Sequence, residues 1–324
     1  MFILIGWCLT TSAQSDEDFQ QIRHLVKQNP DSAIGYVEGI QHGLNNNKRL
    51  QLYLYLIEVL RNEGELDSID DFLNQLQTEW ESYADSSRFK LFSARYTYFF
   101  RQQEFDSAFV IADQMLQYAQ QVDDDYSIFD AYINLGEVHE HAGLYTEGLS
   151  YFQEALKIAE EINDASLKGR VYIKLGVLYS SIENSDLALD YNKLAYNIFS
   201  KEGSSVRLIQ IDNNIGLAYS YLDEFDSAEY YYKRGLSLAR LLDSNFGMAI
   251  TRLNLGMNSE HSGDYQEAMA YLDSARDFFT ATNDVYGQVL YYMNYSRCLT
   301  DIGKTKEAIE LAEKGLKLAE EQNI

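Results

Sequence analysis

The sequence predicts an all-α protein built as a solenoid of antiparallel helix pairs. Small residues recur every forty residues over some two hundred positions, and apolar residues within each unit keep helical spacing. The 324-residue chain holds a single proline, Pro30. Proline interrupts helices, so its near absence favours long uninterrupted ones. A chain of this size with 46% apolar residues exceeds one ordinary core, which indicates two domains or an extended array.

The repeat is clearest at a Leu-Gly pair. Leu135–Gly136 recurs as Leu175–Gly176, Ile215–Gly216 and Leu255–Gly256. Two further columns keep the same spacing: Ala108, Gly148, Ala188, Ala228, Ala268 and Ala308, then Met115, Ala155, Ala195, Gly235, Ala275 and Gly315. Turn-forming residues do the same at Asp123, Asn163, Gly203, Asp243 and Asn283. Small residues at these positions allow two helices to approach closely, and the larger Met115 predicts looser packing in the first regular copy.

Each unit is predicted to contain two helices. In the clearest copy, residues 127–142 carry an apolar stripe, Gly143 breaks it, and residues 145–162 resume helical spacing. Forty residues less two short turns leave about seventeen residues per helix, or roughly 25 Å.

Before residue 86 the pattern loosens, although Pro30-Asp31-Ser32-Ala33 still echoes Phe105-Asp106-Ser107-Ala108. We interpret residues 16–85 as degenerate N-terminal repeats that cap the array, and residues 86–324 as six repeats. Terminal repeats are expected to be atypical because one face meets water.

Residues 1–13 resemble a secretory signal peptide, with an apolar run from Phe2 to Leu9 and small residues up to Ala13. This predicts an exported protein, periplasmic in a Gram-negative bacterium. No Lys or Arg precedes the run, and the alternative is an apolar first turn that packs on the array of a cytoplasmic protein. At the other end, the repeat reaches its next turn at Asn323, just before the last residue, Ile324. We therefore expect either the leading part of a longer protein or a last repeat that docks on a partner, self-association included.

The combination of Leu135–Gly136, Gly143, Tyr145, Phe152 and Ala155 resembles the tetratricopeptide repeat signature. The period of forty instead of the usual 34 and the missing proline late in the second helix are typical of the long-repeat type. That type resembles the sensory and scaffold regions of bacterial signalling proteins. The resemblance implies a right-handed superhelix that binds polypeptides in a concave groove.

Composition and motifs argue against several other classes of protein. A net charge of −24 repels phosphate backbones and anionic lipids, so neither nucleic acid nor direct membrane binding is expected. A membrane would be reached only through a fused or partner protein. The cysteines, Cys8 and Cys298, make no disulfide framework. No phosphate-binding loop, nucleophile elbow or convergent metal ligands are found, so the predictions are no enzyme, no cofactor and no metal.

A column of carboxamides marks the predicted groove: Asn134, Asn214, Asn254 and Asn294, with Lys174 in between. A carboxamide both donates and accepts hydrogen bonds, which suits an extended peptide backbone. The predicted partner-binding residues are completed by Arg170, Gln210, Asn213, Tyr221, His141, His261 and Arg297. The alternative is that each asparagine bonds a neighbouring helix and only determines packing.

The predicted function is a non-enzymatic scaffold that binds a polypeptide segment in bacterial signal transduction. One alternative is the truncated sensor region of a histidine kinase or helix-turn-helix regulator. Another is a sensor of a small ligand or short peptide.

Overall fold

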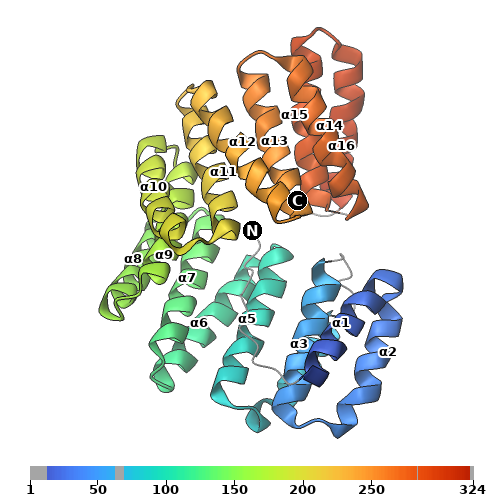
Figure 1. Cartoon of the computed structure of the whole chain (residues 1–324), viewed down its shortest axis with the longest axis vertical. Helices are drawn as coiled ribbons and strands as arrows, with labels where there is room; N and C mark the ends of the chain where they lie inside the picture. The colour runs from blue at the N-terminus through green and yellow to red at the C-terminus, as the bar shows by residue number, and fades with distance from the viewer. Residues whose placement is uncertain (1–12, 63–68, 283, 322–324) are drawn as a thin grey trace. The chain divides into compact units, whose positions relative to one another are not determined.

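The computed structural model describes residues 13–62, 69–282 and 284–321, and these residues form sixteen α-helices, two 3₁₀ turns and no strand. The predicted all-α solenoid of consecutive helix pairs is confirmed. The chain divides into two compact units, Met1–Gln103 and Glu104–Ile324, called unit 1 and unit 2 below (Figure 1).

Unit 1 contains five helices and both 3₁₀ turns. They are α1 (Ala13–Gln28), α2 (Pro30–Ile40), α3 (Asn46–Asn62), α4 (Ile69–Thr78) and α5 (Asp85–Arg101), with the turns at Gln41–Gly43 and Trp80–Ser82. Asn29 caps α2 by accepting a hydrogen bond from the Asp31 N–H, and the chain's one proline occupies the first turn, where no amide donor is needed. Ile22, Leu50 and Ile69 are completely buried in the core of this unit.

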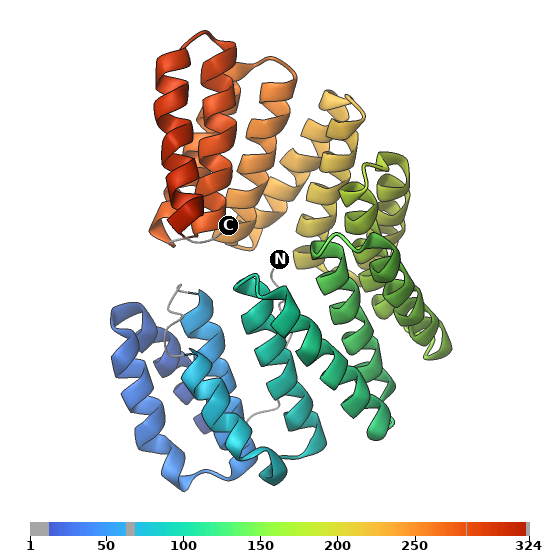
Figure 2. The same cartoon turned by 180° about the vertical axis from the view of Figure 1, so that it is seen from behind.

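Unit 2 contains α6 and five helix pairs that follow one another along the chain (Figures 1 and 2). The helices are α6 (Phe105–Gln121), α7 (Asp125–His141), α8 (Tyr145–Glu161), α9 (Ala165–Ser181), α10 (Ser185–Glu202), α11 (Ser205–Tyr221), α12 (Phe225–Leu241), α13 (Asn245–His261), α14 (Tyr265–Ala281), α15 (Val285–Asp301) and α16 (Thr305–Glu321). All have 17 residues except α10, which has 18, in agreement with the predicted length. Odd-numbered helices are called first helices below, and even-numbered ones second helices.

Short turns separate the helices of unit 2, and each turn that is described in full contains a residue in the left-handed conformation. Gly143, which was predicted to end a helix, has φ 75°. Its N–H donates to Glu140 O and the next N–H, of Leu144, donates to His139 O. These two bonds satisfy carbonyls that the helix end leaves open. Asp123, Asn163, Gly203 and Asp243 of the predicted turn column have positive φ as well.

The small residues lie where two helices touch. A Cβ built on Gly136 would approach the ring of Phe152 to 2.3 Å, and one built on Gly216 would approach Tyr232 to 2.6 Å. The glycine in a first helix therefore makes room for a large side chain of the paired second helix. Met115, where looser packing was predicted, has a completely buried side chain.

Some predictions fall outside the described residues. The proposed leader lies there apart from Ala13, at which α1 begins, and so do the turn residues Asn283 and Asn323. The division into a cap of residues 16–85 and six later repeats stays a prediction. No helix among the described residues combines the length and apolar character needed to cross a bilayer.

Candidate functional site

The first helices of unit 2 form one continuous layer. Beyond packing on its own second helix, each of α7, α9, α11 and α13 also packs on the next first helix, so that α7 to α15 are linked in sequence. Across the described part of unit 2, no comparable packing joins second helices of neighbouring pairs. The stack is therefore tighter along the first helices, which makes this layer the inner side of its curve. All eleven predicted partner-binding residues lie on these five helices.

The asparagine column is engaged within the protein. Asn214 donates to Asn192 Oδ1 at 3.2 Å, and Asn254 donates to Asn213 Oδ1 at 3.0 Å. The remaining two members are buried: Asn134 donates to Met115 Sδ at 3.5 Å and Asn294 to the Leu290 carbonyl at 2.7 Å. Bonds of this kind are expected if the asparagines only hold neighbouring helices together. Asn214 and Asn254 nevertheless remain partly exposed, so their side chains can also be reached from outside.

The middle of the layer carries a polar network between α11 and α13. The buried Asn213 donates to Thr251 Oγ1 at 2.9 Å and accepts from Asn254, so both carboxamide ends bridge to the next repeat. Gln210 lies half-buried on the same helix. Tyr221, at the end of α11, is 54% exposed and is the most accessible aromatic residue of the predicted set.

Ion pairs link neighbouring first helices at both ends of the layer. Arg170 of α9 donates to Asp130 of α7 at 2.7 Å and stands 4.8 Å from the centre of the Phe129 ring. Arg297 of α15 donates to Glu260 of α13 at 2.5 Å and lies 2.9 Å from His261 Nε2. The structure thus brings Arg297, His261 and Asn294 together, with 3.5 Å between the Arg297 Nη1 and Asn294 Oδ1 atoms.

The two histidines at equivalent repeat positions make equivalent contacts. The His141 ring stacks on Phe105 with centroids 5.7 Å apart, and the His261 ring lies 6.4 Å from Phe225. Each phenylalanine begins the preceding second helix. Partial burial of the ring lowers the pKa of His141.

A buried charge cluster between α7 and α9 was not among the predicted site residues. Glu137 pairs with Lys174, and both are less than 10% exposed. Glu140, one turn further along α7, accepts a hydrogen bond from the Ser181 hydroxyl at 3.0 Å. Burial raises the pKa of Glu140 to about 7, with a smaller contribution in the same direction from Glu137. The signal available in the sequence was the lysine that replaces asparagine in the carboxamide column.

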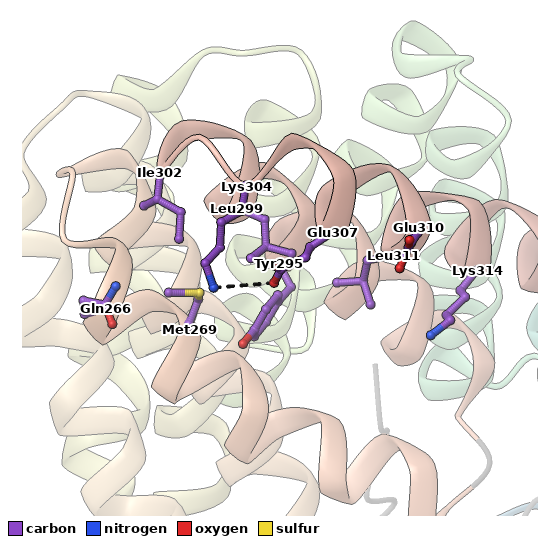
Figure 3. Close-up of a pocket in the computed structure, with 10 residues that line it drawn as sticks. All are labelled: Gln266, Met269, Tyr295, Leu299, Ile302, Lys304, Glu307, Glu310, Leu311 and Lys314. Atoms are coloured by element: carbon purple, nitrogen blue, oxygen red, sulfur yellow. Dashed lines mark hydrogen bonds and ion pairs between the residues drawn. The ribbon is translucent and has the colours of Figure 1, made fainter.

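A surface hollow of about 380 Å³ lies elsewhere, between α14, α15 and α16 (Figure 3). It is lined by Gln266, Met269, Tyr295, Leu299, Ile302, Lys304, Glu307, Glu310, Leu311 and Lys314. None of the predicted partner-binding residues belongs to it. Within the described ranges, no three His, Cys, Asp or Glu side chains gather as a metal site requires.

Stacked helix pairs whose first helices form one continuous layer define a class of protein, the α-helical repeat protein. The chain belongs to the tetratricopeptide repeat family. Models of that family match residues 127–201, 213–240 and 247–321, together more than half of the chain.

The chain is similar to regulators of bacterial signalling. It is 28% identical over 181 residues to response regulator aspartate phosphatase E of Bacillus subtilis strain 168, a match covering 55% of this chain and 48% of that protein. The chain therefore spans about half the length of the curated relatives it matches.

Solved structures show the same fold. A Rap protein in complex with competence and sporulation factor has a TM-score of 0.59 at 18% identity, covering 86% of this chain and 78% of that one. NprR in complex with its cognate peptide NprX has a TM-score of 0.60 at 17% identity, covering 94% and 89%.

The prediction of an exported, periplasmic protein is wrong. The relatives are cytoplasmic regulators, among them a response regulator phosphatase and a transcriptional activator, and nothing in the comparisons indicates a signal peptide.

Proposed function

We propose that this chain is a non-enzymatic regulatory scaffold that binds a peptide or polypeptide segment along the first-helix layer of unit 2. The observation that carries the proposal is the continuous layer itself, because polar residues recur along it, Asn214 and Asn254 remain partly exposed and Tyr221 is exposed. An extended peptide has a regular series of backbone donors and acceptors, which such a surface can satisfy.

The comparisons support the same proposal. Two structures with this fold are complexes with peptides, namely competence and sporulation factor in the Rap protein and NprX in NprR. The phosphatase in the name of the Bacillus relative belongs to a protein of which this chain spans about half. We propose binding, not catalysis, for this chain. Phosphate release from a phosphorylated response regulator at a rate above its own decay would contradict that part.

The two half-exposed asparagines test the binding surface. The double variant Asn214→Ala/Asn254→Ala removes two carboxamides, each worth roughly 1 kcal/mol in hydrogen bonding, so its affinity for peptide should fall about tenfold or more. The measurement is fluorescence anisotropy with labelled pools of short peptides, accompanied by circular dichroism melting.

A matched control is available on α8, where Gln153 and Glu154 are exposed. Gln153→Ala/Glu154→Ala alters two polar side chains of a second helix and should bind peptide like the unmodified protein. If the asparagine variant melted normally and still bound with unchanged affinity, this surface would have to be abandoned as the binding site.

A further inference from the structure

Glu140 and Glu260 occupy equivalent positions, since they are three repeats apart. Each is in the last turn of a first helix, is 7% exposed and precedes a histidine that contacts a phenylalanine. The same position holds Ser180, Ser220 and Thr300 in the other copies of unit 2. Two copies alone therefore bury a carboxylate here, which permits a direct comparison of how each carboxylate is neutralised.

The two carboxylates differ in their partner from the next helix. Glu260 accepts from the guanidinium of Arg297, which reaches it from α15. The residue equivalent to Arg297 on α9 is Val177, which has no donor. Glu140 instead accepts from the hydroxyl of Ser181, a neutral group. The position that faces the buried carboxylate is therefore an arginine, Arg297, beside Glu260 and a valine, Val177, beside Glu140.

Counting charges gives the same contrast. The α7–α9 cluster buries two carboxylates, Glu137 and Glu140, with the single ammonium of Lys174. Lys174 is paired with Glu137, and the neighbouring His141 has a lowered pKa, which disfavours its charged form. When both carboxylates are ionised they outnumber the ammonium by one, which agrees with the raised pKa of Glu140. A buried charge without a counter-charge is costly, and a ligand that supplies the cation recovers that cost.

We propose that Glu140 forms the floor of a subsite that binds an arginine side chain of the bound polypeptide, in the place that Arg297 fills at Glu260. The inference rests on the proposed function and adds the chemistry of one ligand residue. Ser181 and His141 are exposed beside Glu140, so the carboxylate lies next to accessible surface. A guanidinium suits a carboxylate better than an ammonium does, because its planar fork donates two parallel hydrogen bonds.

Three peptide pools of otherwise random sequence test this subsite. All are N-acetylated and C-amidated, and they differ at one central position, which is arginine, lysine or citrulline, the neutral analogue of arginine. The arginine pool should bind about tenfold or more tightly than the citrulline pool, with the lysine pool between them. Glu140→Gln, which keeps the shape of the side chain, should abolish this preference. Glu154→Gln, which removes an exposed charge from α8, should leave it intact.

A second variant tests the subsite directly. Val177→Arg places a guanidinium where Arg297 stands in the equivalent repeat, so it should fill the subsite from within and remove the arginine preference. It should also lower the pKa of Glu140, followed by carbon-13 NMR of the glutamate carboxyls.

The outcomes separate this inference from the proposed function. Binding of all three pools with equal affinity would overturn the arginine subsite and leave the peptide-binding surface standing. An arginine preference that survives in Glu140→Gln would overturn it as well. If no pool bound, both the subsite and the proposed function would fall.

Discussion

Single glycines determine how closely the helices of a pair approach. Gly136 has no room for a Cβ because the Phe152 ring would lie 2.3 Å from it. Gly35, in contrast, has no atom within 4 Å of an added Cβ. The two glycines are both inside helices, so their substitution separates the effect of packing from that of helix propensity.

Gly136→Ala should destabilise unit 2 by about 2 kcal/mol, because an overpacked core forces the ring or the backbone to move. Gly35→Ala should stabilise unit 1 by about 0.5 to 1 kcal/mol through the lower helix propensity of glycine. Urea unfolding of each variant measures both. Equal effects at the two sites would contradict the packing role of Gly136.

Glu140 should make the stability of unit 2 fall as pH rises. Burial raises its pKa from 4.5 to about 7, so the folded state holds a proton that the unfolded state has lost between these values. The proton bound at Glu140 contributes fully to the free energy of unfolding below about pH 4.5, and this contribution is lost above about pH 7. The groups facing it are Glu137 on its own helix and Lys174 and Ser181 on α9.

Glu140→Gln should remove this dependence, because the amide stays neutral. Relative to the unmodified protein, the variant should gain up to about 3 kcal/mol in stability between pH 5 and pH 8. Urea unfolding over this range provides the measurement. Parallel pH profiles for the two proteins would show that Glu140 titrates normally.

The sequence indicates which residues share a position but not what each one touches. The asparagine column was predicted from its spacing, and all four members do lie on first helices. The hydrogen bond from Asn214 to Asn192, however, forms only because α10 has an asparagine at this position. The equivalent residue of α8 is Phe152. Such partners belong to a neighbouring helix and cannot be deduced from one column alone. The pairing of Glu137 with Lys174 and of Glu140 with Ser181 likewise depends on the neighbouring helix α9.

Helix lengths and turns were the most predictable features, because each turn requires a particular backbone. A left-handed residue favours glycine, asparagine or aspartate, and the predicted turn column consists of these types. The other turn of each repeat was harder to see, since Gln103 and Glu183 adopt positive φ without being typical of it.

Glu183→Gly should stabilise the α9–α10 turn by up to about 1 kcal/mol, because glycine adopts φ of 60° without a Cβ clash. The reverse change, Gly143→Ala, should cost about the same amount at φ of 75°. Native-state hydrogen exchange of the flanking amides reports each turn separately. Loss of protection around residue 183 in the glycine variant would refute the expectation.

The described residues belong to two compact units, each with buried apolar clusters of its own. The first core includes Ile22, Leu50 and Ile69, whereas unit 2 has a series of clusters around Phe129, Phe199 and Phe279. A repeat array is stabilised by the interfaces between neighbouring repeats. Unit 2 contains most of these interfaces within its own helices.

A fragment of residues 104–324 should therefore fold by itself and bind peptide pools within about threefold of the intact protein. Circular dichroism and anisotropy are sufficient for the test. A fragment that folds and no longer binds would move part of the binding surface into unit 1.

At this scale the fold was predictable and the cellular location was not. The repeat extends over most of the chain, and each further copy adds independent support for the predicted fold. The predicted export rested on thirteen residues with a short apolar run and no preceding basic residue, a pattern too brief to separate a leader from other apolar segments.

The turns with positive φ recur every twenty residues in unit 2, from Asp123 through Gly143 and Asn163 to Gly263. One residue inserted in a helix would rotate every later side chain of that helix by about 100°. The buried alanines would then face water and the ion pairs between helices would be out of reach. Such a protein can therefore change its length in evolution by gaining or losing whole helix pairs, and each gain adds one more helix to the first-helix layer.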